Sequence, residues 1–189
     1  TDIFRPGLDR SPHQPFRLLF VGNWSRRKGT DLLAPIMQAL GPNFELWVTS
    51  GLRDWRTKTP LPPNIRFLGR VPTTEALVRM YQDADALLCP SRLEGFGLAA
   101  LEAQACGLPV ISTNTTALPE VVSADTALMC PPDAVRDFVD AARTLQCDHA
   151  LWRQMRIAGP QRAQNHFTFT STVRGYKKIY AELVPDHTY

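Results

Sequence analysis

Residues 86–113 read ALLCPSRLEGFGLAALEAQACGLPVIST and contain a complete strand–helix–strand pattern. Two short apolar runs, Ala86–Ser91 and Pro109–Thr113, have the composition of buried parallel strands. Between them, Gly97–Gly107 is rich in alanine and leucine and is bounded by glycines, which predicts a helix. Because two parallel strands need a long crossover connection, this stretch predicts one unit of a parallel sheet.

The same alternation extends from this unit in both directions. The other expected strands are Phe16–Gly22, Phe44–Ser50, Ile65–Gly69 and Thr126–Cys130, and the other expected helices are Thr30–Gly41, Thr73–Ala84 and a helical pattern from Asp133 to about Leu183. Residues 53–64 are polar and Pro-rich, which is typical of an exposed loop. Repeated units of this length predict an α/β fold, a Rossmann-like doubly wound parallel sheet with helices on both faces.

In such a sheet, ligands bind beyond the carboxyl ends of the strands. The loops that reach this edge follow Gly22, Gly69, Ser91 and Thr113. These loops are therefore where we expect a functional site.

Composition and charge exclude several classes of protein. A chain of 189 residues with 44% hydrophobic and 21% charged residues has the profile of a globular protein with a sizeable core, not of a disordered one. The net charge of +3 is too small to indicate nucleic-acid binding. No apolar run reaches the length of a membrane span and no signal-peptide pattern opens the chain, so we expect a cytoplasmic protein.

The cysteines are widely spaced, at positions Cys89, Cys106, Cys130 and Cys147. They form no Cys-x-x-Cys pair of the kind that indicates zinc or thioredoxin-like chemistry. We expect them to be buried thiols in a reducing compartment rather than disulfides.

The loop after the first expected strand, Gly22–Asp31, reads GNWSRRKGTD and is basic. Its cations directly precede a helix start, where free N–H groups and the helix dipole favour an anion. It is not a P-loop, because Lys28 is followed by Gly29 and not by Ser or Thr. By itself the loop is compatible with a phosphate site and with a solvated basic turn.

A second glycine-containing segment, Gly95–Ala100, fits the loose Gly-x-Gly-x-x-Ala dinucleotide fingerprint. It comes late in the chain, however, and residues 91–94 separate it from the preceding strand. The next strand ends in Ser-Thr-Asn, without an acid to hold a ribose in the usual way. These features disfavour a nicotinamide enzyme. Taken singly, Glu94 and Glu102 would be solvated surface residues.

Residues 90–111 together resemble the signature of the group 1 family of retaining, nucleotide-sugar-dependent glycosyltransferases, which have the GT-B fold. That signature has two glutamates separated by seven residues, with Gly-Phe-Gly after the first and Ala-x-x-x-Gly-x-Pro-Val after the second. Its elements stand here as Glu94, Gly95, Phe96, Gly97, Glu102, Ala103, Gly107, Pro109 and Val110.

The resemblance covers most of the chain. TDIFRP resembles the segment that leaves the interdomain linker, LLFVGNWSRRKG the diphosphate loop, NIRFLGRVP the base-binding strand and turn, and FTFTSTVRGYKKIYAEL the terminal helices. It implies that residues 1–15 end an interdomain linker and that residues 16–189 form a single Rossmann-like donor-binding domain. This domain would be one half of a GT-B fold with C-terminal helices, and the N-terminal acceptor domain would be absent.

The resemblance also implies roles for particular residues. Glu94 would contact the donor sugar, Glu102 the ribose hydroxyls, and Lys28 the leaving diphosphate, without a metal; Glu94 and Lys28 are thus the catalytic candidates. Arg70 and Val71 would hold the nucleobase, and the remaining donor-binding candidates are Asn23, Arg27, Gly95, Phe96, Gly97 and Leu98. Asn23 stands where the family usually has Arg, so we expect Arg26 or Arg27 to replace that charge.

The implied function is that of a retaining, hexosyltransferase-type glycosyltransferase. It would move a sugar from a UDP-, GDP- or ADP-sugar to a hydroxyl of a glycan, lipid or other acceptor, with no cofactor and no nucleic acid, and with membrane contact only through the parent protein. Because the chain begins with Thr1 and no acceptor domain precedes it, we expect the isolated domain to be inactive. The alternatives are a stand-alone nucleotide-sugar binding or regulatory module, or a GT-B relative such as a nucleotide-sugar epimerase.

Overall fold

The computed structural model describes residues 3–50 and 60–183, and its centre is a parallel β-sheet. The strand order is β3-β2-β1-β4-β5-β6. The strands are β1 (Phe16–Val21), β2 (Phe44–Thr49), β3 (Ile65–Gly69), β4 (Ala86–Cys89), β5 (Val110–Thr113) and β6 (Ala127–Cys130). Every neighbouring pair is parallel, which confirms the Rossmann-like, doubly wound sheet that the sequence predicts.

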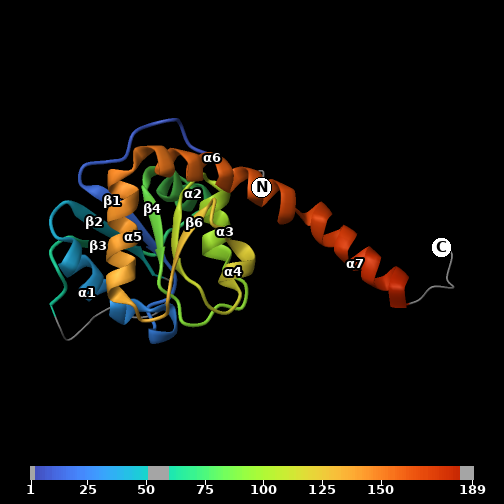
Figure 1. The fold of residues 1–189 in the computed structure, drawn as a ribbon, viewed down its shortest axis with the longest axis horizontal. Helices are drawn as coiled ribbons and strands as arrows, with labels where there is room; N and C mark the ends of the chain where they lie inside the picture. Colours follow the sequence, from blue (N-terminus) through green and yellow to red (C-terminus); the bar gives the residue numbers. More distant parts are fainter. Residues whose placement is uncertain (1–2, 51–59, 184–189) are drawn as a thin grey trace.

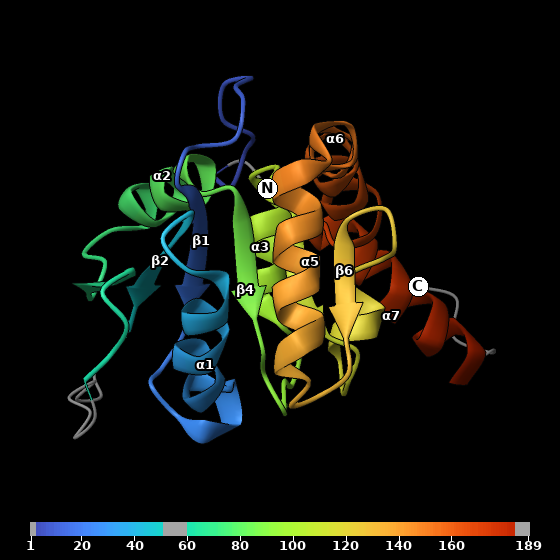
Figure 2. The same ribbon diagram turned by 60° about the vertical axis from the view of Figure 1, so that its left-hand side comes forward.

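Helices cover both faces of this sheet. On one face lie α1 (Thr30–Leu40) and α5 (Val135–Cys147), which Figure 2 shows side by side in front of the strands. On the other lie α2 (Thr74–Asp83), α3 (Leu98–Ala105) and α4 (Leu118–Val121). In β1, Leu18 and Phe20 pack into the first core and Leu19 into the second. Because side chains alternate between faces, a strand covered on both sides must be apolar throughout.

Two further helices complete the chain. Helix α6 (His149–His166) crosses the amino ends of the strands, where Trp152 Nε1 donates to the carbonyl of Asp85 at 2.8 Å. Helix α7 (Phe169–Leu183) then projects away from the body of the protein (Figure 1), and it contributes no buried residue. Among the helices in residues 3–50 and 60–183, none combines the length and the apolar character needed to cross a membrane.

The structure differs from the sequence prediction at several boundaries. Two short elements were not predicted: the 3₁₀ turn η1 (Arg26–Lys28) and helix α4. The strand expected to reach Ser91 ends at Cys89, because Pro90 has no N–H to continue a ladder. The loop predicted over residues 53–64 lies largely outside the described residues. The division at residue 15 between linker and domain stays a prediction.

All four cysteines are free thiols, as predicted, but the expected burial is confirmed for three of them and wrong for the fourth. Cys89, Cys106 and Cys130 are free and buried. Burial raises the pKa of Cys89 to about 11 and the pKa of Cys106 and Cys130 to about 12. Cys147 is exposed, because it is the last residue of α5 and lies where that helix meets solvent.

Candidate active site

The sheet has one topological switch point, between the central strands β1 and β4. The chain continues from β1 to β2 on one side and from β4 to β5 on the other, so the loops that follow β1 and β4 diverge. In open α/β sheets this divergence creates the crevice in which ligands bind. The basic loop after β1 and the first glutamate after β4 are thereby brought to the same place.

Gly29 fixes how closely these two loops approach. It has φ of 71°, in the left-handed region, and forms the N-cap of α1. A Cβ atom added at this position would lie 2.0 Å from the carbonyl oxygen of Pro90. Only glycine combines this backbone conformation with this close approach. The Lys28-Gly29-Thr30 order, which excludes a P-loop, therefore has a packing reason.

Lys28 and Glu94 form an ion pair at this junction. Lys28 Nζ donates to Glu94 Oε1 at 2.6 Å, and the side chains are 17% and 8% exposed. Ser91 Oγ donates to the same carboxylate oxygen at 2.8 Å. The backbone N–H of Glu94 donates to Thr116 Oγ1 at 3.1 Å. Three loops therefore hold Glu94, and its second oxygen has no hydrogen-bond partner within the described part of the chain.

Ser91 and Thr116 were not predicted as site residues. Ser91 carried a weak signal, since it is a polar residue at the end of an apolar strand pattern. Thr116 carried none. It has a positive φ of 54° in the loop after β5, and only the fold brings it against Glu94.

An arginine braces the outer side of the same junction. Arg92 donates to Asp31 at 2.7 Å and to Asp133 at 2.7 Å, so it connects α1, the loop after β4 and the segment before α5. The hydrogen bond between Arg92 and Asp31 lowers the pKa of Asp31 and raises the pKa of Arg92, to which Asp133 also contributes. The side chains are partly exposed, so this network positions the loops more than it stabilises the fold.

A cavity of about 450 Å³ opens beside the ion pair. It is lined by Val21, Gly22, Asn23, Arg27, Lys28, Thr49, Ser50, Arg70, Val71, Leu77, Leu98, Ala99 and Glu102. The carboxyl ends of β1 and β2, the turn after β3 and the first turn of α3 all contribute. Seven of the predicted site residues are in this lining: Asn23, Arg27, Lys28, Arg70, Val71, Leu98 and Glu102. Glu94 is not in this lining, but it is the ion-pair partner of Lys28, which is.

Two further residues named in the sequence prediction, Phe96 and Arg26, are not in this lining. Phe96 is 43% exposed and packs edge-to-face against Phe167, with ring centroids 6.0 Å apart, so its ring points toward the end of α6. Arg26 lines a separate hollow with Trp24 and Asp31. Arg27 is in the cavity lining, but its guanidinium donates to the carbonyl of Leu93 at 2.9 Å. Of the two arginines expected to replace the missing family arginine, Arg27 is therefore the one at the site.

The first turn of α3 contributes backbone donors to the cavity. Gly97 is the N-cap with φ of 98°, and the helix begins at Leu98. The first N–H groups of a helix have no intrahelical acceptor. Since Leu98 and Ala99 line the cavity, their part of the helix start is placed to receive an anion beside Lys28.

Glu102 lies one turn further along α3 and has a different environment from Glu94. Tyr81 of α2 donates its hydroxyl to Glu102 Oε2 at 2.8 Å. Burial raises the pKa of Glu102, and the Tyr81 hydrogen bond opposes that rise by stabilising the carboxylate. Burial, with the charge of Glu102, raises the pKa of Tyr81 well above its usual value, so the tyrosine stays a donor.

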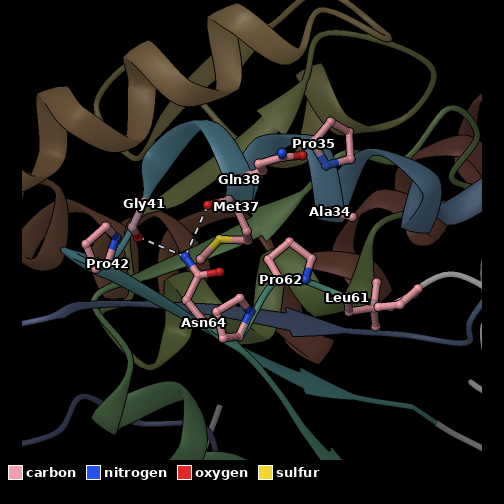
Figure 3. A pocket seen from close by; sticks show the side chains of 11 residues that line it. Ala34, Pro35, Met37, Gln38, Gly41, Pro42, Leu61, Pro62 and Asn64 are labelled. Atoms are coloured by element: carbon pink, nitrogen blue, oxygen red, sulfur yellow. Dashed lines mark hydrogen bonds between the residues drawn. The ribbon is translucent and has the colours of Figure 1, made fainter.

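A larger hollow lies near the amino ends of β2 and β3 but lacks such chemistry. Its volume is about 740 Å³, and it lies between α1 and the segment 60–64 (Figure 3). Asn64 Nδ2 donates to the carbonyls of Met37 and Gly41 and thereby ties the segment to the end of α1. The described residues that line this hollow are all uncharged, so it offers nothing for a diphosphate.

Comparison with known sequences identifies the family. Residues 15–148 match the family described as Glycosyl transferases group 1. D-inositol 3-phosphate glycosyltransferase of Corynebacterium jeikeium is 34% identical over 98% of this chain and 50% of its own length. O-antigen chain mannosyltransferase B of Escherichia coli is 40% identical over 85% of this chain and 45% of its own. The chain spans about half the length of the curated relatives it matches.

Solved structures agree with this assignment. Sucrose-phosphate synthase of Thermosynechococcus elongatus has a TM-score of 0.80 and 26% identity over 98% of this chain and 51% of its own. The C-terminal domain of a glycosyl transferase group 1 family protein of Francisella tularensis has a TM-score of 0.74, and at 21% identity it shows the fold alone; 97% of that domain is covered. This chain therefore belongs to the group 1 glycosyltransferases, and it has the fold of the C-terminal domain of a GT-B enzyme.

Proposed function

We propose that the cavity at the switch point binds a nucleoside-diphosphate sugar, and that the chain supplies the donor half of a retaining glycosyltransferase. One observation carries this proposal: Lys28, paired with Glu94, and the carboxylate Glu102 border the same cavity as the start of α3. A cation beside free helix N–H groups suits a diphosphate, and a carboxylate suits vicinal hydroxyls.

The residues divide the donor among them. Lys28 and the amides at Leu98 and Ala99 hold the diphosphate and stabilise its charge as the sugar departs, so this chemistry requires no metal. Glu102 accepts the ribose hydroxyls. Arg70 and Val71, in the turn after β3, border the base. Glu94, which is paired with Lys28, contacts the sugar.

The relatives named above support a sugar-transfer function, since their names include a glycosyltransferase and a mannosyltransferase. Retention of the anomeric configuration rests on the resemblance of Glu94 and Glu102 to the paired-glutamate signature. Titration with UDP, GDP and ADP distinguishes the three candidate bases.

Calorimetry on this chain tests the proposal directly. With chelator present, we expect one of the three nucleoside diphosphates to bind. Lys28→Ala should weaken that binding, whereas Lys178→Ala, which removes an 80%-exposed lysine on α7, should leave it unchanged. If none of the three binds at millimolar concentration, the cavity is not a donor site.

We expect these residues alone to transfer no sugar. The cavity can hold a donor, but placing an acceptor hydroxyl accounts for about 7–11 kcal/mol of barrier reduction in well-oriented reactions. A stand-alone binding module would bind the donor equally well, so transfer after adding the rest of the parent protein distinguishes the two functions. NMR of the glycoside formed would then report whether the anomeric configuration is retained.

A further inference from the structure

Tyr81 is a fully buried tyrosine whose hydroxyl reaches the cavity wall. The residue is 0% exposed, and its ring packs edge-to-face against Phe4 with centroids 6.3 Å apart. Its hydroxyl donates to Glu102 Oε2 at 2.8 Å. A buried tyrosine hydroxyl needs some partner, so the contact alone is compatible with a purely structural role.

The geometry of the Glu102 carboxylate favours a role in ligand binding in addition to a structural one. The Tyr81 bond occupies Oε2, while Oε1 has no hydrogen-bond partner within residues 3–50 and 60–183. A carboxylate fixed through one oxygen presents the other in a defined direction. Glu102 itself lines the cavity, so the oxygen without a partner belongs to a side chain of the cavity wall.

Helix α2 connects the two ends of the nucleoside region. It follows directly after Arg70 and Val71, and its N-cap Thr73 accepts a hydrogen bond from the N–H of Ala76 at 3.1 Å. Leu77 lines the cavity, and Tyr81 lies one helical turn beyond it on the same face. Helix α2 therefore leads from the turn that contains Arg70 and Val71 to Tyr81, the residue that contacts Glu102.

We propose that Tyr81 is a positioning residue: its hydroxyl holds the Glu102 carboxylate in the orientation in which the free oxygen accepts the ribose hydroxyls of the donor. This inference rests on the proposed function, in which Glu102 binds the ribose. Tyr81 itself does not touch the ligand.

Within the described residues, the neutral hydroxyl of Tyr81 is the group that donates a hydrogen bond to the Glu102 carboxylate. The thiols of Cys89 and Cys106 lie near Tyr81, and burial keeps the pKa of both far above neutral. The cations that line the same cavity are Arg27, Lys28 and Arg70. Of these, Lys28 is already paired with Glu94 and Arg27 with the carbonyl of Leu93.

The test is Tyr81→Phe, which keeps the ring and removes only the hydroxyl. Wild-type protein should prefer the ribonucleoside diphosphate over its 2′-deoxy analogue. We expect Tyr81→Phe to lose most of that preference, with about tenfold weaker binding of the ribonucleotide, the scale of one hydrogen bond to a charged group. Tyr180→Phe, on the exposed face of α7, is the matched control and should match the wild type.

A pH profile gives a readout that packing alone would not move. Glu102 accepts hydroxyls as a carboxylate, so binding is lost as the pH falls through the pKa of Glu102. Removing the Tyr81 hydroxyl removes a bond that lowers this pKa. The acid limb of ribonucleotide binding should therefore move to higher pH in Tyr81→Phe and stay in place in Tyr180→Phe.

The variant Glu102→Gln distinguishes a failure of the positioning role of Tyr81 from a failure of the ribose assignment of Glu102. If Glu102→Gln abolishes the ribose preference while Tyr81→Phe keeps both the wild-type preference and the wild-type acid limb, the positioning role is overturned and the donor site stands. If Glu102→Gln binds like the wild type, the ribose assignment fails and the inference fails with it.

A measurement on the unmodified chain covers the case in which Tyr81→Phe does not fold. The ζ-carbon resonance of Tyr81 should shift with the same pH midpoint as the loss of ribonucleotide binding, because both follow protonation of Glu102. A resonance that stays constant across that midpoint would contradict the proposal.

Discussion

Two buried carboxylates lie at opposite ends of β4, and they differ in how their oxygens are used. Asp85, just before the strand, is 0% exposed and accepts from Arg10 Nη1 at 2.6 Å and from the backbone N–H groups of His13 at 3.1 Å and Arg17 at 2.8 Å. Both of its oxygens have donors. Glu94, just after the strand, receives Lys28 and Ser91 on one oxygen only.

The difference distinguishes a carboxylate whose two oxygens are both used within the fold from one that keeps an oxygen for a ligand. Asp85 ties residues 10–17 to the amino edge of the sheet and leaves no oxygen for a ligand. Glu94 keeps an oxygen without a partner in the described chain and holds a lysine that lines the cavity. Substitutions at the two ends should therefore act on different quantities, the free energy of unfolding at Asp85 and ligand binding at Glu94.

The largest effect should come from Asp85→Ala. It leaves the Arg10 guanidinium and two backbone donors without their acceptor, and removing one partner of a buried pair costs about 3–5 kcal/mol. Urea unfolding of the ligand-free protein measures this loss. Asp140→Ala, which removes a surface pair with Arg136 at 3.7 Å, is the control and should cost less than about 1 kcal/mol. Equal losses of unfolding free energy in Asp85→Ala and Asp140→Ala would contradict the structural role of Asp85.

Lys28→Ala should act on ligand binding instead. We expect nucleoside-diphosphate binding to weaken by about 1–3 kcal/mol, because a charge-assisted contact is lost. Binding of the nucleoside, without phosphates, should be nearly unchanged. Calorimetry with both ligands measures the two effects, and a variant with unchanged diphosphate affinity would make the loop after β1 a solvated turn.

The two glutamates of the signature should differ from each other. Glu102→Gln should weaken binding of both the bare nucleotide and the sugar nucleotide. Glu94→Gln should weaken binding of the sugar nucleotide while binding the bare diphosphate slightly more tightly, by less than about 1 kcal/mol, because Lys28 is released from its partner. Identical profiles for the two variants would contradict the division of roles.

The smallest effect should be the pH dependence of nucleotide binding in the wild type. Burial raises the pKa of Glu102 above its usual value, so the carboxylate that accepts hydroxyls is lost at a higher pH than for an exposed glutamate. Affinity should be full near neutral pH and should fall as the pH drops through that raised pKa. Glu102→Gln has no such group, so the part of the pH dependence that belongs to Glu102 should be absent from this variant.

Much of the fold could be predicted from the sequence because the relevant signals are local. The apolar runs that became β1 to β6 and the glycine-bounded helix α3 each show their periodicity within a few residues. The short elements η1 and α4 could not be predicted in this way. Three or four residues carry too little periodicity, and α4 depends on the packing of Leu118 and Val121 into the core.

The candidate site likewise contains residues that the sequence indicates and residues that only the fold brings in. Glu94 and Glu102 stand in a motif that can be recognised by its spacing, and Lys28 was assigned through the resemblance of its loop to the family's diphosphate loop. Ser91, Thr116 and Tyr81 could not be assigned in this way, because each acts through a hydrogen bond to one of the two glutamates, and only the folded chain shows which side chains reach them. The turn of Phe96 away from the cavity toward Phe167 is likewise a contact over a long sequence separation.

The sequence by itself determined the alternation of strands and helices, the parallel sheet and the family of the chain, since periodicity and motif spacing are properties of neighbouring residues. Only the tertiary structure decided which loops meet. The strand order places β1 beside β4, and this neighbourhood brings Lys28 to Glu94 and opens the cavity toward Arg70. Side-chain chemistry is local in the chain, but a binding site depends on distances that the packing of the sheet and helices sets.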